Sequence, residues 1–393
     1  MQKVYKSKKY CCGCTACYSI CPRNAIVMQS DACGFLYPVI NEKKCVNCGL
    51  CVEVCAFAKK NENKIFKRCY VAKHKKVDVI NESRSGGAFT ALTDYILNNG
   101  GVIYGASLEN NFIVKHIRAV NEKERNKIRK SKYVQSYLEN IFKQVLNDLK
   151  NEKHVLFSGT PCQCEGIKSF LLNQNISLEK LILCDIVCHS NASPGLFEKY
   201  LIYIEKKIGK KIKKYYFRDK SKFTWWEHVE KIVFNDGYVF YTNEYTNLFF
   251  TDDIRPSCFN CKYTSLHRAT DITLADAWGA EKIYPDFIDT KGTSLILVNT
   301  DKGLKVLQCI SKDLLLRDVD ITAVMQPRLK EAAKKGEFYE QFWNDYKNIE
   351  FSKFINKYSQ NDYTLKKRLI RKSFKILKLP FRILKKAVEN LYD

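Results

Sequence analysis

Residues 11–22 read CCGCTACYSICP and residues 45–55 read CVNCGLCVEVC, and these two stretches decide the fold of the N-terminal part of the chain. Each stretch places three cysteines at intervals of three residues and a fourth cysteine four residues later. Three thiolates at this spacing let a short loop wrap one corner of an iron–sulfur cube, and the fourth thiolate is carried away to a second cube. The doubled pattern therefore predicts two [4Fe–4S] clusters that exchange their fourth ligands.

The spacing divides the eight cysteines into two ligand sets. One predicted set is Cys11, Cys14, Cys17 and Cys55, and the other is Cys45, Cys48, Cys51 and Cys21. Cys12 lies only two positions before Cys14 and therefore breaks the spacing. A pair of zinc sites is the alternative, but zinc usually takes its ligands as two Cys-x2-Cys pairs, which leaves the third cysteine of each stretch without a role. Residues 10–57 resemble bacterial dicluster ferredoxins.

The placement of the cysteines also indicates a cellular compartment. Ten of the 18 cysteines fall before residue 56, and no apolar stretch typical of a secretion signal precedes them. Metal ligation under reducing conditions explains this density better than disulfides do. No apolar run approaches the ~20 residues that a membrane-spanning helix needs. We therefore expect a soluble, cytoplasmic protein.

The chain is strongly basic, with a formal net charge of +24. Three [4Fe–4S] clusters, each held by four thiolates, would lower this value to about +18. An anionic partner is therefore expected: a cofactor phosphate, an acidic donor protein, nucleic acid or lipid headgroups. Nucleic acid is the least favoured of these partners, because the chain contains no recognisable motif for reading bases.

With 393 residues, 46% of them hydrophobic, the chain can form two or three compact units. We expect a dicluster ferredoxin-like domain at 1–60, a larger domain of the α/β (α+β) class at 68–310, and a helical, basic C-terminal region at 311–393. Helical spacing is seen at 88–98 and 136–150, and an Asp-Gly turn divides the run at 231–241 into a hairpin. Strand patterns occur at 102–108, 154–159, 181–188, 231–241 and 294–299.

The last thirty residues differ in composition from the rest. Residues 363–388 contain ten Lys or Arg and no Asp or Glu, and apolar residues recur there at helical spacing. Such a helix would suit the surface of an anionic membrane, at its inner face. Pro380 would kink or break it, so a solvated basic face or a disordered tail are the alternatives.

A second set of cysteines is dispersed through the larger unit. Cys162 and Cys188 follow two predicted strands, and Cys258 and Cys261 form a Cys-x2-Cys pair in a turn-like loop. Four thiolates from three loops could hold a third cluster or a structural zinc, or could simply be buried thiols. The spacing alone leaves these three possibilities open.

Six motifs arrive in order along the larger unit: SRSGGAFTAL (83–92), KSKYVQS (130–136), SGTPCQ (158–163), DIVCH (185–189), RPSCFNCK (255–262) and DITLADAWG (271–279). Together they resemble the beta-subunit family of coenzyme F420 hydrogenases and dehydrogenases, over about residues 68–310. The resemblance implies FAD and a [4Fe–4S] cluster, with Cys162, Cys188, Cys258 and Cys261 as ligands. The chain departs from the family pattern at two places. Residues 190–192 read SNA where Gly-Val-Pro is commoner, and Ala275 replaces the usual glycine. Because of these departures, the resemblance does not identify the substrate.

The resemblance also nominates residues for the flavin. Small residues before a helix let backbone N–H groups approach a diphosphate, although an ordinary capped helix start is the alternative at residues 83–87. Lys132 is expected to add a charge near the phosphates, and Tyr133 either contacts the ring or is a core aromatic. The nominated flavin contacts are Ser85, Gly86, Gly87, Lys132, Tyr133, Gln135, Ser158, Gly159 and Thr160.

Two residues are candidates for catalysis. His189, beside Cys188, is either a proton donor, a hydrogen-bond partner of a cluster sulfur or a structural histidine. Asp276 at a strand end either orients a cofactor or caps a turn.

The resemblance implies an FAD-dependent iron–sulfur oxidoreductase, because flavin exchanges single electrons with clusters and electron pairs with a substrate. The electron donor is expected to be a ferredoxin, a nicotinamide or a deazaflavin carrier. Family relatives with a fused ferredoxin unit often accompany surface-polysaccharide genes, which implies a role in glycan building near the membrane. The alternative is a membrane-associated electron-transfer adaptor without its own substrate.

Overall fold

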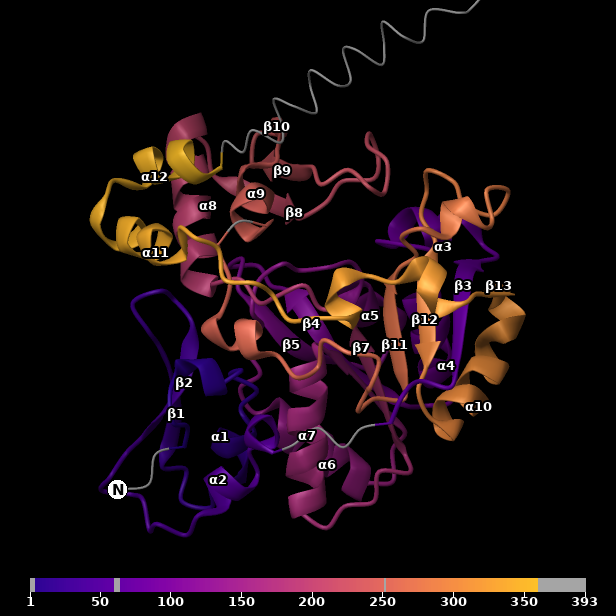
Figure 1. Ribbon diagram of the computed structural model, residues 1–393, viewed down its shortest axis with the longest axis horizontal. Coiled ribbons are helices and arrows are strands. Elements are labelled where there is room, and N and C mark those ends of the chain that lie inside the picture. Colours follow the sequence, from indigo (N-terminus) through magenta and orange to yellow (C-terminus); the bar gives the residue numbers. More distant parts are fainter. Residues whose placement is uncertain (1–3, 60–63, 251, 360–393) are drawn as a thin grey trace, which may run out of the picture.

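The computed structural model describes residues 4–59, 64–250 and 252–359, and its centre is a mixed eight-stranded sheet (Figure 1). The strands, in spatial order, are β13 (Leu314–Asp318), β3 (Arg68–His74), β12 (Ser294–Val298), β11 (Ile272–Asp276), β7 (Leu181–Ile186), β6 (Val155–Gly159), β4 (Val102–Leu108) and β5 (Val114–Ala119). The central strands β11, β7, β6 and β4 are parallel, and antiparallel strands flank them on both sides. The expected mixed α/β class is confirmed.

Helices cover both faces of this sheet because alternate side chains of the buried strands point to opposite faces. Ile103, Leu156 and Ile182 pack under α4 (Ala88–Asn98) and α10 (Asp301–Ile310). Their neighbours Tyr104 and Phe157 pack under α6 (Ile141–Lys150) and α7 (Pro161–Asn173) on the other face. Parallel strands buried in this way end at one edge, where loops can gather functional residues.

The N-terminal unit lies against α6 and α7, as the indigo ribbon in Figure 1 shows. It consists of a two-stranded sheet, β1 (Ile26–Ser30) and β2 (Leu36–Ile40), and the short helices α1 (Ala16–Ile20) and α2 (Leu50–Glu53). Ile20, Val54 and Phe57 share one apolar core with Ile167 and Phe170 of α7. The unit is therefore packed into the body of the protein.

A second, smaller sheet with four helices forms another core. Its strands are β8 (Ile212–Tyr216), β9 (Glu230–Phe234) and β10 (Val239–Thr242), and the predicted Asp-Gly turn joins β9 to β10. Tyr200 and Phe342 lie in this aromatic-rich core. The helices are α8 (Pro194–Ile208), α9 (Glu244–Phe250), α11 (Tyr339–Asn348) and α12 (Phe351–Tyr358).

All the predicted strands are present, and the predicted helix at 88–98 is α4. The helix expected at 136–150 begins at Ile141, because Tyr137 is held as a bridge partner of Lys115 beside the sheet. β13 lies beyond residue 310 and pairs with β3, so the sheet extends past the expected boundary. The remaining elements are α3 (Val77–Glu82), α5 (Glu122–Ile128) and the 3₁₀ turns η1 (Lys8–Tyr10), η2 (Ala56–Ala58), η3 (Pro256–Asn260), η4 (Ala280–Lys282), η5 (Ser311–Asp313), η6 (Ile321–Val324) and η7 (Pro327–Leu329).

Among the described residues, no helix has the length and apolar character to cross a bilayer. The basic segment expected to contact a membrane, residues 363–388, lies outside the described residues.

Candidate active site and metal centres

The second cysteine stretch lines a small cavity near the surface. The wall of this cavity includes one predicted ligand set, Cys21, Cys45, Cys48 and Cys51. The loop turns through left-handed backbone at Asn47 and Gly49, where α2 begins. Cys21 reaches the cavity from the end of α1, so the fourth thiol comes from the other stretch. Cys48 is exposed, and we call this group the outer set.

The first stretch lines a separate cavity deeper in the protein. Its wall contains Cys11, Cys14, Cys17 and Cys55, together with Cys12. Burial raises the pKa of Cys17 well above its usual range, and repulsion from the Cys14, Cys11 and Cys55 thiolates raises it further. The structure thus gathers the other predicted set, with its fourth cysteine exchanged. We call Cys11, Cys14, Cys17 and Cys55 the inner set.

The dispersed cysteines form a third group. Cys162 lies in the first turn of α7, Cys188 follows β7, Cys258 belongs to η3 and Cys261 ends it. Burial raises the pKa of Cys188 well above its usual range, followed by repulsion from the Cys258, Cys162 and Cys261 thiolates. Such repulsion is strong only over short distances, so three loops bring the four thiols together.

A [4Fe–4S] cube and a single zinc ion need different arrangements of cysteine thiols. Among the described residues, no three His, Cys, Asp or Glu side chains lie close enough to hold one metal ion. Zinc would require four ligands within about 2.3 Å of a single centre. A [4Fe–4S] cube takes each thiolate on a different iron, so its ligands surround a larger volume. Each of the three groups offers four cysteine thiols, which is the donor set of such a cube.

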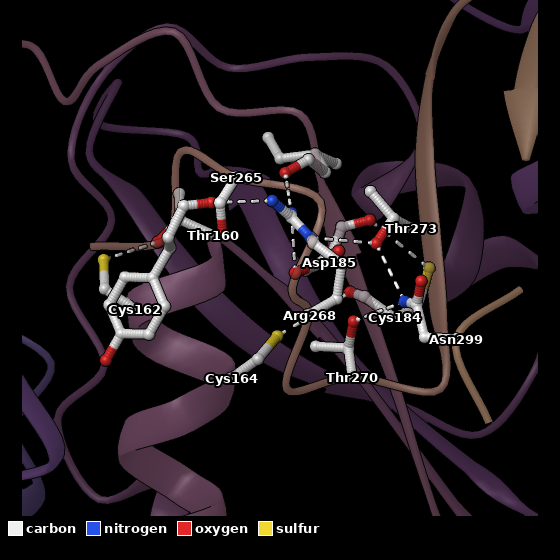
Figure 2. A network of polar contacts seen from close by, with 12 residues as sticks. Thr160, Cys162, Cys164, Cys184, Asp185, Ser265, Arg268, Thr270, Thr273 and Asn299 are labelled. Carbon is white, nitrogen blue, oxygen red and sulfur yellow. Dashed lines mark hydrogen bonds and ion pairs between the residues drawn. The ribbon is translucent and has the colours of Figure 1, made fainter. Parts of the chain in front are cut away.

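A buried ion pair joins Arg268 to Asp185 of the central sheet (Figure 2). Arg268 donates from Nη2 to Oδ2 of Asp185 on β7 at 2.8 Å, and both side chains are only 1% exposed. The same guanidinium donates to the carbonyl oxygen of Tyr263 at 2.8 Å and to the Thr273 hydroxyl on β11 at 3.2 Å. The segment that follows Cys261 is thereby tied to the strand that leads to Cys188.

Helix α7 connects the inner set to the third set. Its first turn carries Cys162, and one turn later Gly166 packs directly on the Cys14 side chain. A Cβ atom at Gly166 would lie 2.8 Å from Sγ of Cys14, so only glycine allows this approach. Interaction with the Cys14 thiol, followed by interaction with the Cys162 thiol, raises the pKa of the buried Cys12 thiol, so the three side chains lie close together. The two groups of ligands are therefore immediate neighbours.

A buried arginine locks the same junction. Arg255, three residues before Cys258, donates to the carbonyl oxygens of Cys11 and Leu36 at 2.9 and 2.8 Å. It also donates to Oε1 of Gln135 at 2.9 Å, and Gln135 donates to the carbonyl oxygen of Cys12 at 3.4 Å. Gln135, nominated as a flavin contact, is thus placed at the junction with the N-terminal unit. Sequence reasoning did not nominate Arg255, although it lies within the RPSCFNCK motif.

A cavity of about 300 Å³ lies at the carboxyl ends of the parallel strands. Residues from five of the six motifs line it, and it includes Cys188 of the third set. This volume is within the range of small-molecule sites. Of the nominated flavin and catalytic residues, those that line this cavity are Ser85, Gly87, Lys132, Tyr133, Ser158, Gly159, Thr160, His189 and Asp276.

The start of α4 forms one wall of the cavity. Gly87 begins the helix with a φ of +90° and no side-chain cap, and Ala88, Phe89 and Thr90 line the cavity. An uncapped helix N-terminus offers backbone N–H groups to a phosphate, so this wall fits the diphosphate of a dinucleotide. Gly86 instead packs between β3 and β12, where its N–H donates to the Ser294 hydroxyl at 3.0 Å.

The polar wall of the cavity carries more positive than negative charge. Nη2 of Arg84 lies 3.6 Å from Oδ2 of Asp276, and Nη1 of Arg218 lies 3.8 Å from the same atom. Burial raises the pKa of Asp276, and the neighbouring Arg84 opposes this effect. Arg218 also donates to the Tyr133 hydroxyl at 3.1 Å. The ring of Tyr133 packs against Phe249 as well, so this tyrosine serves both the core and the cavity.

Lys132 has a local role in addition to its place at the cavity. Its ammonium donates to four backbone carbonyls of residues 127–130 at 2.7 to 3.2 Å, around the end of α5. Three N–H donors shared by four acceptors leave little capacity for a phosphate. Burial lowers the pKa of Lys132 to about 7. The phosphate contact expected from the sequence therefore remains a prediction.

Three histidines, His116, His189 and His228, line the cavity. The ring of His189 packs against Trp278 with 5.1 Å between ring centroids, and burial lowers its pKa, followed by repulsion from Arg328. His116, which the sequence did not single out, contacts the Ser158 carbonyl oxygen at 3.0 Å and the Ser136 hydroxyl at 2.9 Å. Burial lowers the pKa of His116 to about 4, so its imidazole is neutral at pH 7.

Comparisons with known proteins agree with these two parts of the chain. Residues 152–322 match the family described as the C terminus of the coenzyme F420 hydrogenase/dehydrogenase beta subunit, and residues 10–59 match the 4Fe-4S dicluster domain. The resemblance expected from the motifs is confirmed, and the dicluster match falls on the N-terminal unit that carries the outer and inner sets. A comparison with curated proteins finds no match.

One similar solved structure is a chain in the xenon-derivatised F420-reducing [NiFe] hydrogenase complex from Methanosarcina barkeri. The two chains are 17% identical with a TM-score of 0.48, and the alignment covers 68% of this chain and 87% of that one.

Proposed function

We propose that this chain is an iron–sulfur flavoprotein oxidoreductase that passes electrons between [4Fe–4S] clusters and a two-electron acceptor or organic substrate through FAD. The two family matches support an electron-transfer protein related to the F420 hydrogenase beta subunit. When bound, the clusters carry single electrons and FAD converts them into pairs.

One observation carries the proposal: the three groups of thiols follow one another from the surface to the cavity. The outer set includes the exposed Cys48, and Cys14 and Cys17 of the inner set are buried in the core that α7 shares. Cys12 contacts both the inner ligand Cys14 and the third-set ligand Cys162. Cys188 of the third set lines the cavity at the carboxyl ends of the strands. This order supports electron entry or exit at Cys48 and two-electron chemistry at the cavity.

The residues of the cavity would serve binding and proton transfer. The uncapped start of α4 would hold the diphosphate, and the apolar wall would exclude water from the reacting atoms. His189 and Asp276 would hold or move a proton, at an imidazole nitrogen and at Oδ2, because both line the cavity beside Cys188 and Arg84. The packing of His189 on Trp278 fixes the orientation of its ring.

A metal and flavin count after anaerobic reconstitution tests the proposal. The full chain is expected to bind about twelve iron atoms, in three cubes of four, and one FAD. The Cys258→Ser/Cys261→Ser variant is expected to keep about eight iron atoms, because the outer and inner sets remain. About eight iron atoms in the unaltered chain would remove the third cluster, and absence of flavin would remove the two-electron site.

The donor, whether a ferredoxin, a nicotinamide or a deazaflavin carrier, is part of the same proposal. A role in surface-polysaccharide building rests on the resemblance alone, and the segment expected to contact a membrane lies outside the described residues.

A further inference from the structure

Thr15 occupies the position in the first cysteine stretch that Gly49 occupies in the second. Each follows the second cysteine of its stretch, Cys14 in one case and Cys48 in the other. Each also precedes a short helix in left-handed backbone, Thr15 with a φ of +65° before α1 and Gly49 with a φ of +81° before α2. The two loops therefore make the same turn, one with a glycine and the other with a branched side chain.

The left-handed conformation is unfavourable for a threonine. Glycine adopts it readily because it has no Cβ atom, whereas a branched side chain crowds the backbone there. In the described part of the chain, Thr15 is the only β-branched residue with a positive φ. Glycine in its place would relieve this strain, as the turn at Gly49 shows. A strained residue of this kind indicates that its side chain has a function.

The hydroxyl of Thr15 has no partner within the described residues. The side chain is buried, with 3% of the residue exposed, and Oγ1 forms no hydrogen bond there. A threonine before a helix usually accepts a hydrogen bond from a backbone N–H of the first turn. At α1 the threonine has left-handed backbone, and this capping bond is absent. A buried hydroxyl without a partner is destabilising, so it indicates a partner other than these residues.

The cavity of the inner set is the place where this hydroxyl can find its partner. Thr15 lines that cavity together with the four cysteines of the inner set. A [4Fe–4S] cluster held there would offer thiolate and sulfide sulfurs as hydrogen-bond acceptors. The cavity of the outer set differs, because none of the described residues that line it is a serine, threonine or tyrosine. The hydroxyl is therefore a feature of the inner site alone.

We infer that the Thr15 hydroxyl donates a hydrogen bond to a sulfur of the inner cluster and raises the reduction potential of that cluster. This inference rests on the proposed function, because it assigns a tuning residue to one of the proposed clusters. A donor at a cluster sulfur stabilises the reduced state, which carries more negative charge. Thr15 thereby acts in the same direction as the positive charge of Arg255 beside Cys11. It distinguishes two clusters whose cysteine spacing is the same.

A redox titration of the reconstituted full chain, followed by electron paramagnetic resonance, tests the inference. Thr15→Val keeps the shape of the side chain and removes the donor. At a fixed applied potential, the ratio of reduced to oxidised inner cluster is expected to be roughly fivefold lower in this variant, the effect of losing one hydrogen bond. Thr15→Ser keeps the hydroxyl and is expected to titrate as the unaltered chain does. The outer cluster, whose signal Cys48→Ser identifies, is the internal control and is expected to titrate unchanged.

Thr15→Gly separates tuning from a structural role. It removes both the hydroxyl and the backbone strain, so it is expected to lower the inner-cluster potential as Thr15→Val does. It is also expected to unfold at the same urea concentration as the unaltered chain or at a higher one, whereas a structural threonine would give a less stable variant.

Iron is counted on the same samples, and about twelve atoms per chain are expected in the three Thr15 variants. Full iron with an unchanged inner-cluster potential in Thr15→Val and Thr15→Gly would overturn the inference and leave the proposed function standing. A Thr15→Ser variant that titrates like Thr15→Val would also overturn it. An unaltered chain that holds no iron at the inner set would refute both the inference and the proposed function.

Discussion

The guanidinium of Arg255 donates to the backbone carbonyl oxygen of Cys11 at 2.9 Å, and it joins two residues that are 244 positions apart. Nη2 of Arg255 also lies 3.8 Å from Sγ of Cys11. The Cζ atom of the guanidinium lies over the Tyr37 ring, 4.1 Å from the ring centroid. A fully buried positive charge therefore stands beside an inner-set ligand. This contact secures the N-terminal unit to the loop that carries Cys258.

Replacing Arg255 by Met is expected to destabilise the protein by about 2–4 kcal/mol, because three buried acceptors lose their charged donor. Loss of the positive charge beside Cys11 is also expected to lower the reduction potential of the inner cluster, since a nearby cation favours the added electron. Denaturant unfolding and a redox titration followed by electron paramagnetic resonance would measure the two effects. Arg255→Lys is the control, because it keeps the charge; equal potentials in the Met variant and the unaltered chain would contradict the tuning role.

Gly166→Ala is expected to destabilise the protein by roughly 1–3 kcal/mol and to reduce iron at the inner set, because the new Cβ would overlap Sγ of Cys14. The same substitution in an unobstructed helix interior usually stabilises. Iron content after reconstitution and denaturant unfolding are the measurements. Leu172→Ala on an exposed part of α7 serves as the control and is expected to change neither quantity. A more stable Ala variant with full iron would show that α7 does not press on Cys14.

Alkylation of the reduced, cluster-free chain is expected to modify Cys48 and Cys309 first, because both are exposed, whereas Cys14 and Cys17 are buried. After reconstitution Cys48 is expected to be protected by iron, while Cys309, which belongs to none of the three sets, stays reactive. Peptide mapping by mass spectrometry would follow each thiol. Labelling of Cys14 as fast as Cys48 in folded protein would contradict the buried position of the inner set.

The protein is expected to lose stability as pH rises through neutrality because of Glu230. This carboxyl is fully buried, accepts hydrogen bonds from the Tyr200 and Tyr215 hydroxyls at 3.2 and 2.8 Å, and burial raises its pKa to about 7. The folded state therefore keeps a proton that the unfolded chain releases near pH 4.5. The stabilisation is complete below that pH and is lost as pH rises through about 7, by about 3 kcal/mol in total.

Urea unfolding of the unaltered chain and of Glu230→Gln between pH 5 and pH 8 measures this effect, because glutamine cannot ionise. As pH rises, the unfolding free energy of the unaltered chain is expected to fall relative to that of the Glu230→Gln variant. Parallel curves over that range would show that Glu230 is ionised in the folded state.

The patterns that predicted this fold are local ones. The continuous apolar run at Ser294–Val298 and the Asp-Gly turn carry their structure within a few residues, and both elements form as expected. The separation of the eight N-terminal cysteines into two groups follows from spacing as well. The contacts of Arg255 and Gln135 could not be predicted in this way, because the two side chains bind each other and backbone carbonyls more than 100 positions away, which no sequence pattern marks.

The sequence motifs predicted many residues of the cavity, but not those that lie outside the motifs. Motifs separated by up to about 190 positions converge on it because parallel strands end at one edge of the sheet. His116 could not be predicted because it lies in β5, a strand with no motif, and its partners are Ser158 of β6, which lies beyond β4 in the sheet, and Ser136. Arg218 lies after β8 and reaches the site only through the packing of the second core.

The shared core of the N-terminal unit and α7 bears on how the protein meets its redox partner. If the chain were cut after residue 59, the isolated N-terminal unit would expose the apolar side chains of Ile20, Val54 and Phe57 to solvent. It would also lose the hydrogen bond from Arg255 to Cys11. The unit is therefore an integral part of this protein, although it resembles ferredoxins that exist as separate proteins. Under the proposed function, an electron carrier is therefore expected to dock on the side of the molecule where Cys48 is exposed.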